Sequence, residues 1–371
     1  MVVKLQLPPT LIIGGGASQQ AAAEAQRLGM RRPLLVVDPY LRSSQPAALL
    51  AAALPTAVFS GVTPDPDLDV VAAGLVALRA HQADGIVALG GGSTIDAAKA
   101  IAILATNPGP LSAYMGYHKV PAPGLPLIAI PSTAGTGSEA TRVTIITDRA
   151  RNLKMMILDG YLLPTVALVD YELSLSTPAA LTAAVGLDSL THALEAYVSR
   201  KASPFSDSIA LEAGRLIVPH LRRAYTNPQD LPAKEAMMTG ATLGGMAFSN
   251  ASVALVHGMS RPLGAFFHIP HGLSNAMLLP AITRFSLSGN PERYAAFAAH
   301  TGLGSDILAA LEAFNRDLHV PTLREYGVPE AAYRAAMPQM ADDALASGSP
   351  GNNPRVPSKD EILTLYAEVY R

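Results

Sequence analysis

One aspartate and three histidines in the C-terminal half of the chain have the residue types and spacing of a metal site. Asp188 and His192 are four residues apart, so they lie on one face of a helix. His257 and His271 come later in the chain, and each is followed by a glycine. A histidine taken alone is more often a core or surface residue, but one carboxylate with three imidazoles suits a divalent first-row metal. The combination therefore predicts a metal site.

Two segments rich in glycine and hydroxyl groups follow strand-like runs in the N-terminal half. Ala88–Lys99 reads ALGGGSTIDAAK, and its exposed backbone N–H groups at a helix start could hold a phosphate. Pro131–Glu139 reads PSTAGTGSE. An ordinary β–α connection and a helix-capping loop are the alternative interpretations. Because ligands of doubly wound sheets bind at the carboxyl ends of strands, we expect both segments to line one crevice.

Asp38 predicts which nicotinamide cofactor such a crevice would bind. It ends the strand-like run Leu34–Val37, about twenty residues beyond the turn Gly14–Gly16. A carboxylate at this position accepts hydrogen bonds from ribose hydroxyls and repels a 2′-phosphate, which favours NAD(H) over NADP(H). A simple Asp-Pro turn is the alternative.

The elements that must position these residues change character along the chain. The alternation of strand-like and helical patterns in the first half predicts a parallel sheet with helices on both faces. The predicted strands are 34–38, 85–89, 127–130, 143–147, 155–158 and 166–170, and the predicted helices are 19–28, 68–83 and 94–105. Beyond residue 178 the predicted elements are helices, at 178–199, 207–225, 234–256 and 272–285, with more to the C-terminus.

The fold prediction is therefore an α/β domain over residues 1–177, with a Rossmann-like parallel sheet that binds a dinucleotide. An all-helical domain over residues 178–371 would carry the metal site. A cleft between the two is the default place for a ligand.

Composition excludes several classes of function. Apolar residues make up 49% of the 371 residues and the net charge is −2, which argues against disorder, nucleic acid binding and attachment to an anionic membrane. Cysteine is absent, so disulfides, thiolate metal sites and a cysteine nucleophile are excluded. No apolar run reaches the roughly 18 residues of a membrane span, and the N-terminus lacks the features of a secretory signal. A cytoplasmic protein is expected.

Four motifs carry a resemblance to a known family. They are GGGSTIDAAK at Gly90–Lys99, PSTAGTGSE at Pro131–Glu139, GLDSLTHALEAY at Gly186–Tyr197, and HGMSRPLGAFFHIPHGLSNAMLLP at His257–Pro280. With them the sequence resembles the iron-containing (group III) alcohol dehydrogenases nearly end to end. The resemblance implies the dehydroquinate synthase-like architecture of that family, with an α/β N-terminal domain and an all-helical C-terminal domain.

The resemblance also implies an activity and a role for particular residues. The activity is reversible hydride transfer between a small alcohol or aldehyde and NAD(H), with the substrate oxygen on the metal. The metal would be Fe²⁺, with Zn²⁺ as a possible substitute, and the protein at least a homodimer. The implied metal ligands are Asp188, His192, His257 and His271. The implied cofactor-binding residues are Gly91, Gly92 and Ser93 at the pyrophosphate, Thr133 and Thr136 at the nicotinamide half, Lys154 and Leu175 at the adenosine and ribose side, and Asp38 and Asp96.

Two other functions are alternatives to this one. A lyase or a polyol or polyol-phosphate dehydrogenase, like dehydroquinate synthase or glycerol dehydrogenase, could use the same fold. Enzymes of phosphorylated substrates should cluster Lys and Arg around the metal helix, but Gly186–Tyr197 contains none. A catalytically silent cofactor-binding protein should have lost a ligand, whereas all four are present.

Several positions near the predicted ligands bear on the substrate and the proton. Arg261 stands where many relatives have a further histidine. A guanidinium stays protonated, so it cannot take up the proton that an alcohol releases when it becomes an alkoxide. It could bind a substrate oxygen or pair with a carboxylate, while His268 is a candidate relay. Phe248 and Phe267 could form an apolar wall, and Ser349 lies in a loop that relatives use near the substrate.

Asp65 bears on the cofactor instead. Relatives often have asparagine at this position near the ribose, which argues against the NAD(H) prediction.

Overall fold

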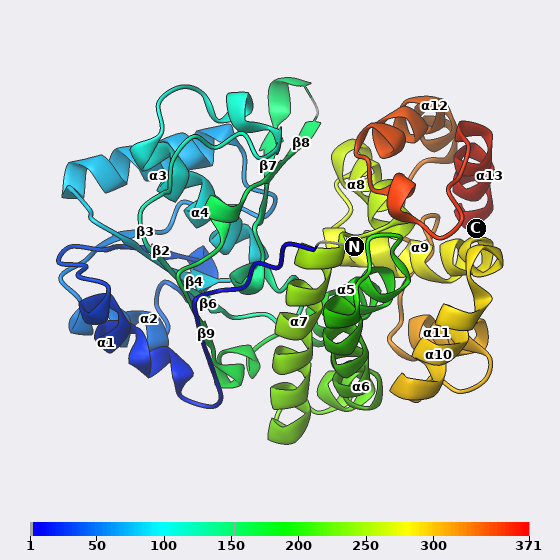
Figure 1. Cartoon of the computed structure of the whole chain (residues 1–371), viewed down its shortest axis with the longest axis horizontal. Coiled ribbons are helices and arrows are strands. Elements are labelled where there is room, and N and C mark those ends of the chain that lie inside the picture. Colours follow the sequence, from blue (N-terminus) through cyan, green and yellow to red (C-terminus); the bar gives the residue numbers. More distant parts are fainter. Residues whose placement is uncertain (1–2, 152, 371) are drawn as a thin grey trace. The chain divides into compact units, whose positions relative to one another are not determined.

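The computed structural model describes residues 3–151 and 153–370 (Figure 1). They divide into two compact units, one spanning Lys4–Ser176 and the other containing Val3 and the residues from Thr177 onward. The first is an α/β unit and the second is helical, as the sequence predicts. The roles assigned to the two domains, dinucleotide binding and metal binding, stay predictions.

The α/β unit is built on six parallel strands in the order β1-β9-β6-β4-β2-β3. The strands are β1 (Thr10–Ile13), β2 (Leu34–Val37), β3 (Ala57–Phe59), β4 (Ile86–Gly90), β6 (Leu127–Pro131) and β9 (Val166–Val169). The helices are α1 (Ala21–Arg27), α2 (Gln45–Ala53), α3 (Leu68–His81) and α4 (Gly92–Thr106). The predicted parallel sheet is confirmed, and β1, β3 and α2 are elements that the sequence analysis missed.

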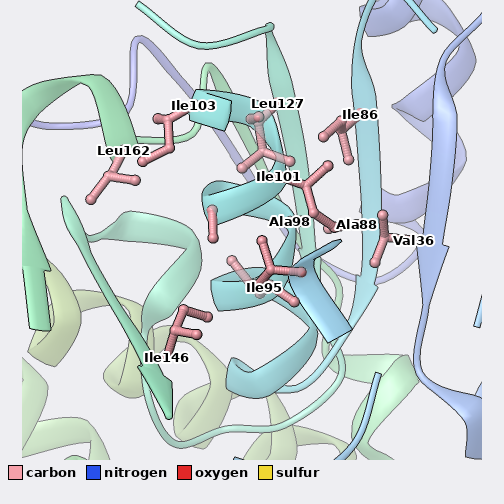
Figure 2. Packing of buried hydrophobic residues seen from close by; sticks show 14 of the residues in the cluster. Val36, Ile86, Ala88, Ile95, Ala98, Ile101, Ile103, Leu127, Ile146 and Leu162 are labelled. Carbon is pink, nitrogen blue, oxygen red and sulfur yellow. The ribbon is translucent and has the colours of Figure 1, made fainter. Parts of the chain in front are cut away.

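Helices cover both faces of this sheet because successive side chains of a strand point to opposite sides. Leu34 and Val36 belong to the hydrophobic cluster that contains Ile95 and Ile101 of α4 (Figure 2). Leu35 and Val37, from the same strand, belong to a second cluster with residues of α1 and α2. Both sets are fully or almost fully buried, which explains why the central strands read as continuous apolar runs.

Two of the predicted strands form a separate sheet. The order of its strands is β5-β8-β7, where β5 is Gly116–Tyr117, β7 is Val143–Asp148 and β8 is Leu153–Leu158. β7 and β8 pair antiparallel. The connection between them is too short for a crossover, so a hairpin is the geometry that can join them.

The second unit is helical and is built around one buried helix. The long helices are α5 (Ala179–Val198), α6 (Pro204–Thr226), α7 (Leu231–Ala251), α8 (Leu255–Phe267) and α9 (His271–Ser286). The shorter helices are α10 (Pro291–Thr301), α11 (Ile307–Asp317), α12 (Glu330–Ala346) and α13 (Lys359–Val369). From Thr182 onward almost every residue of α5 is buried, because α6, α7 and α9 pack around it.

The helix predicted over 234–256 is two helices in the structure. α7 ends at Ala251, and Ser252 has a φ of 67°, which a continuing helix does not allow. Asn352 stabilises the break by donating hydrogen bonds to Ser252 Oγ (3.0 Å) and to the carbonyl oxygen of Val253 (3.1 Å). No glycine or proline marks this break in the sequence, and its stabilising partner lies 100 residues away, so local pattern could not reveal it.

Among the residues that the structure describes, no helix combines the length and the apolar character that crossing a bilayer requires.

Candidate metal centre and nucleotide-binding loops

The helical unit brings the four predicted metal ligands together. Asp188 and His192 lie on α5, His257 on α8 and His271 on α9, and one potential ligand atom from each lies within 4.8 Å of the others. Asp188 Oδ1 is 3.7 Å from His192 Nε2, 3.5 Å from His257 Nε2 and 3.9 Å from His271 Nε2. Two atoms that bind one tetrahedral ion at ~2.1 Å lie about 3.4 Å apart. The donor set and its spacing therefore fit a single divalent ion.

Three of the four predicted ligands are buried, and the fourth is partly exposed. Asp188, His192 and His257 are 1–3% exposed, whereas the side chain of His271 is 32% exposed. Burial disfavours the charge on Asp188, but the neighbouring imidazoles outweigh it and hold the carboxyl pKa below its usual range. Burial lowers the pKa of His192 to about 3. Asp188 is therefore ionised and His192 neutral at pH 7, the forms that bind metals.

A glycine allows α9 to approach α5 closely at this site. A Cβ atom at Gly272 would lie 2.6 Å from the carbonyl oxygen of Ala184 and 3.2 Å from Asp188 Cβ, so no larger residue fits without a shift. This close approach places His271, the first residue of α9, beside the aspartate of α5. The glycine after the fourth predicted ligand thus has a packing reason.

Asn275 is a member of the site that the sequence analysis missed. Its side-chain Nδ2 lies 2.6 Å from Asp188 Oδ1, 3.1 Å from His257 Nε2 and 3.3 Å from His271 Nε2. An amide nitrogen can only donate, so this geometry suits an aspartate and imidazole nitrogens that carry no proton on this side. The signal was available, because Asn275 follows His271 by four residues and lies on the same face of the helix.

In the α/β unit, the two predicted loop segments lie against each other. Gly91 caps α4 and Gly92 is its first residue, so Gly92 and Ser93 present backbone N–H groups at a helix start. A Cβ atom at Gly92 would lie 2.6 Å from Thr136 Cγ2, and one at Gly91 would lie 3.4 Å from Thr133 Oγ1. The segments follow β4 and β6, which are neighbouring strands, as the prediction of one shared edge requires.

Asp96 has a structural role beside its predicted cofactor role. Its carboxylate accepts hydrogen bonds from Ser138 Oγ (2.6 Å) and from the backbone N–H of Ile145 (2.9 Å). It thereby ties α4 to the second loop segment and to β7. Contact between Asp96 and the cofactor stays a prediction.

Lys99 reinforces the same junction from beneath the loop. Its ammonium donates to Ser138 Oγ (3.0 Å), Thr141 Oγ1 (2.9 Å) and the carbonyl oxygen of Val143 (2.8 Å), which matches its three protons. Burial lowers the pKa of Lys99 to about 8, so the group is still protonated at pH 7. Lys99 thus connects α4 to the Ser138 side chain, near the end of the second segment, and to the start of β7.

Asp38 lies at the same edge of the sheet, but for a different reason from the one that the sequence suggested. Gly14–Gly16 follows β1, and three strands separate β1 from β2, so that turn does not follow a strand next to the strand of Asp38. The neighbour of β2 is β4, and a Cβ atom at Gly90 would lie 3.0 Å from Asp38 Cβ. Asp38 is therefore adjacent to the first loop segment, and its carboxylate accepts a hydrogen bond from Tyr40 N–H (2.9 Å).

The remaining cofactor candidates occupy other places in the α/β unit. Lys154, on β8, is half-buried and forms an ion pair with Asp65 (2.8 Å), so the two residues predicted for the ribose side contact each other. Leu175 is half-buried and follows a short 3₁₀ helix, Tyr171–Ser174, that comes after β9. The predicted roles of Lys154 and Leu175 stay predictions.

The residues flagged for the substrate pocket divide into two groups. Phe248 stacks on His192, with ring centroids 4.3 Å apart, and Arg261 donates a hydrogen bond to Ser349 Oγ (2.9 Å). Phe267 contacts the rings of Phe266 and Tyr333 instead. His268 is exposed at the end of α8 with a φ of 54°. Of the two phenylalanines, Phe248 is therefore the one that contacts a predicted ligand.

Comparison with known families identifies the chain. The family described as iron-containing alcohol dehydrogenase matches residues 8–171, and its C-terminal counterpart matches residues 182–370. The chain belongs to the iron-containing alcohol dehydrogenase family. The family and enzyme class predicted from the sequence are confirmed, and the lyase and polyol-phosphate alternatives are not favoured.

Individual members of the family are similar over their whole length. The chain is 38% identical to 1,3-propanediol dehydrogenase of Klebsiella pneumoniae, covering 98% of each chain. It is 36% identical to NAD-dependent methanol dehydrogenase of Bacillus methanolicus, covering 97% of each. Among solved structures, a 1,3-propanediol oxidoreductase matches with a TM-score of 0.94 at 36% identity, covering 100% of each chain. An alcohol dehydrogenase from Oenococcus oeni also matches with a TM-score of 0.94, at 32% identity and the same coverage.

Gly92→Ala should weaken cofactor binding without unfolding the protein. The added methyl group collides with Thr136 and moves the loop from the α4 N-terminus, so we expect the Kd for NADH to rise about tenfold, or ~1.4 kcal/mol. Fluorescence titration with NADH measures the Kd. Gly351→Ala is the matched control, because its methyl group would meet no atom within 4 Å. Equal affinities for the Gly92→Ala variant and the wild type would contradict the role of this loop.

Proposed function

We propose that this protein is a metal-dependent dehydrogenase that transfers hydride reversibly between a small alcohol or aldehyde and NAD(H). The observation that carries the proposal is the cluster of Asp188 and three imidazoles, buried except at His271. Fe²⁺ is the ion that the family implies. Mixed Asp and His ligation also suits Zn²⁺, which binds such sites more tightly than Fe²⁺.

The side chains of the helical unit hold the ion and admit the substrate. Asp188, His192, His257 and His271 supply four ligands, and the exposed side of His271 leaves an approach for a small molecule. When bound, the ion supplies Lewis acidity, which lowers the pKa of an alcohol hydroxyl. Asn275 donates to Asp188 Oδ1, and Phe248 gives His192 an apolar neighbour.

The side chains of the α/β unit bind the cofactor. Backbone N–H groups at Gly92 and Ser93 suit a pyrophosphate, and Thr133 and Thr136 offer hydroxyls next to them. Asp38, adjacent to Gly90, suits the ribose hydroxyls of NAD(H). The Lys99 network keeps the threonine-bearing loop in place.

The relatives and the chemistry of the site favour small substrates without phosphate. Two of the similar proteins are named for 1,3-propanediol and for methanol. The ligand-bearing segment Gly186–Tyr197 contains no lysine or arginine that could bind a phosphate. Short primary alcohols, diols and their aldehydes are therefore the proposed substrates. The predicted homo-oligomer and the predicted cytoplasmic location stay predictions.

Asp188→Asn should abolish metal binding while the helical unit stays folded. The substitution keeps the side-chain volume but removes the only anionic ligand. Loss of a residue that merely holds a ligand in place lowers metal affinity about 10–100-fold, and loss of this ligand should lower it further. Metal analysis and NADH oxidation with short aldehydes, with and without chelator, measure the effect. Asp360→Asn, at an exposed aspartate of α13, is the matched control. Full turnover of metal-free wild type would overturn the proposed function.

Asp38→Gly should relax the cofactor preference. Without the carboxylate, a 2′-phosphate no longer meets a like charge, so we expect the ratio of kcat/KM for NADP(H) to that for NAD(H) to rise about tenfold. Steady-state kinetics with both cofactors give this ratio. A wild-type enzyme that already prefers NADP(H) would show that Asp38 does not select the cofactor.

Arg261→Ala should change the KM for the substrate more than the pH dependence. Arg261 lies one turn after His257, and its guanidinium cannot titrate in the physiological range. Loss of a charge-assisted hydrogen bond predicts a KM change of about 10-fold or more. Ser349→Ala removes the partner hydroxyl but keeps the charge, so it separates the effect of this hydrogen bond from that of the charge.

Comparison of pH–rate profiles separates this role from a proton relay. Profiles of the wild type, Arg261→Ala and His268→Ala should place any lost ionisation in the His268 variant. An ionisation that disappears in Arg261→Ala alone, with unchanged KM, would overturn the role proposed for Arg261.

A further inference from the structure

A second carboxylate on α5 contacts the predicted metal site from behind. Glu195 is 3% exposed, and three donors surround its side chain. Oε2 accepts from Ala254 N–H (2.9 Å) and from His257 Nδ1 (2.7 Å), and Oε1 accepts from Val256 N–H (2.6 Å). Glu195 is neither a predicted metal ligand nor a predicted cofactor-binding residue.

The contact with Glu195 decides which nitrogen of His257 carries a proton. An ionised carboxylate only accepts hydrogen bonds, so Nδ1 must be the protonated nitrogen. In the neutral ring, Nε2 then carries a lone pair, and it lies 3.5 Å from Asp188 Oδ1 on the side of the predicted metal. The neutral ring is thus in the tautomer that a metal ligand needs.

The same carboxylate also determines where α8 begins. His257 is the third residue of this helix, and Ala254, at the N-cap, provides no side-chain cap. Glu195 accepts hydrogen bonds from two of the N–H groups at this helix start, where a negative charge is favourable. One side chain therefore fixes both the backbone around His257 and the direction of its ring.

We infer that Glu195 is a positioning residue of the metal centre, which sets the tautomer and orientation of His257 and thereby the affinity for the metal. The inference rests on the proposed function, because it requires an ion at Asp188 and its three imidazoles. Asp188, His192 and Glu195 follow one another at intervals of four and three residues, so they share a face of α5.

The test compares metal affinity among three variants of the full chain. Glu195→Gln leaves one acceptor oxygen for three donors and removes the charge behind His257, and Glu195→Ala removes every acceptor. Ser199→Ala is the matched control, because it removes a buried hydrogen bond to Ala251 (2.6 Å) at the end of α7 without touching His257. Chelator competition with Zn²⁺ on apoprotein gives the Kd, and thermal unfolding checks that each variant is folded.

We expect the Kd for Zn²⁺ to rise about 10–100-fold in Glu195→Gln and further in Glu195→Ala. Ser199→Ala should stay within about twofold of the wild type, because it leaves the ligand and its partner intact. If Glu195→Ala fails to fold, Glu195→Gln alone decides. Wild-type affinity in the folded Glu195 variants would overturn the inference.

A second readout needs no metal. Nitrogen-15 NMR of histidine-labelled apoprotein, with His257 assigned from His257→Gln, reports which ring nitrogen is protonated. The wild type should show proton-bearing Nδ1, and Glu195→Ala should show a substantial Nε2-protonated population. A wild-type ring protonated mainly at Nε2 would contradict the inference. Failure of the wild type to bind any metal would instead overturn the proposed function and the inference with it, so the two failures are distinguishable.

Discussion

The buried charge of Asp188 constrains the whole centre of the helical unit. Moving a carboxylate out of water costs several kcal/mol unless other groups compensate it. Within the described part of the chain, the ion-pairing groups within 4.0 Å of this carboxylate are imidazoles, one of them on its own helix and two on α8 and α9. Burial opposes a charge on His257, but the contacts with Asp188 and Glu195 raise its pKa, so this imidazole can carry the compensating positive charge, and the Asn275 amide adds one hydrogen bond. A dication at this place would supply the positive charge instead, and this makes the same cluster suitable as a metal site.

The α/β unit handles buried charge in a different way. The Lys99 ammonium is fully buried, but each of its protons has an oxygen acceptor, so nothing remains for a ligand to complete. Its effect is mechanical, because it fixes the loop whose threonines face Gly91 and Gly92. The contrast separates two uses of a buried charge. A charge whose protons all have oxygen acceptors shapes a binding surface, and a charge surrounded by metal-binding side chains creates a binding site.

The sequence revealed what depends on local spacing and missed what depends on distant partners. The i, i+4 pair of Asp188 and His192 and the apolar runs of the parallel strands are visible in short windows, and so is the position of the glycine loop. The order of the strands is not, because β1 pairs with β9 across more than 150 residues, and this separated Gly14–Gly16 from Asp38. The break at Ser252 depends on Asn352 for the same reason. Asn275 and Glu195 stood inside quoted motifs, and the spacing places Asn275 on the face of His271, but the contacts of both with His257 appear only when separate helices meet.

All four predicted ligands are positioned by α5, a helix that is buried almost throughout. It carries Asp188 and His192 itself. It fixes His257 through Glu195, which caps the start of α8 and orients the ring. It admits His271 through the close approach of Gly272 to the carbonyl oxygen of Ala184. A metal site needs its ligands within a few tenths of an ångström of their places. Because every ligand is positioned by the same helix, the ligands are placed precisely relative to one another. Three helices positioned independently would give less precise placement.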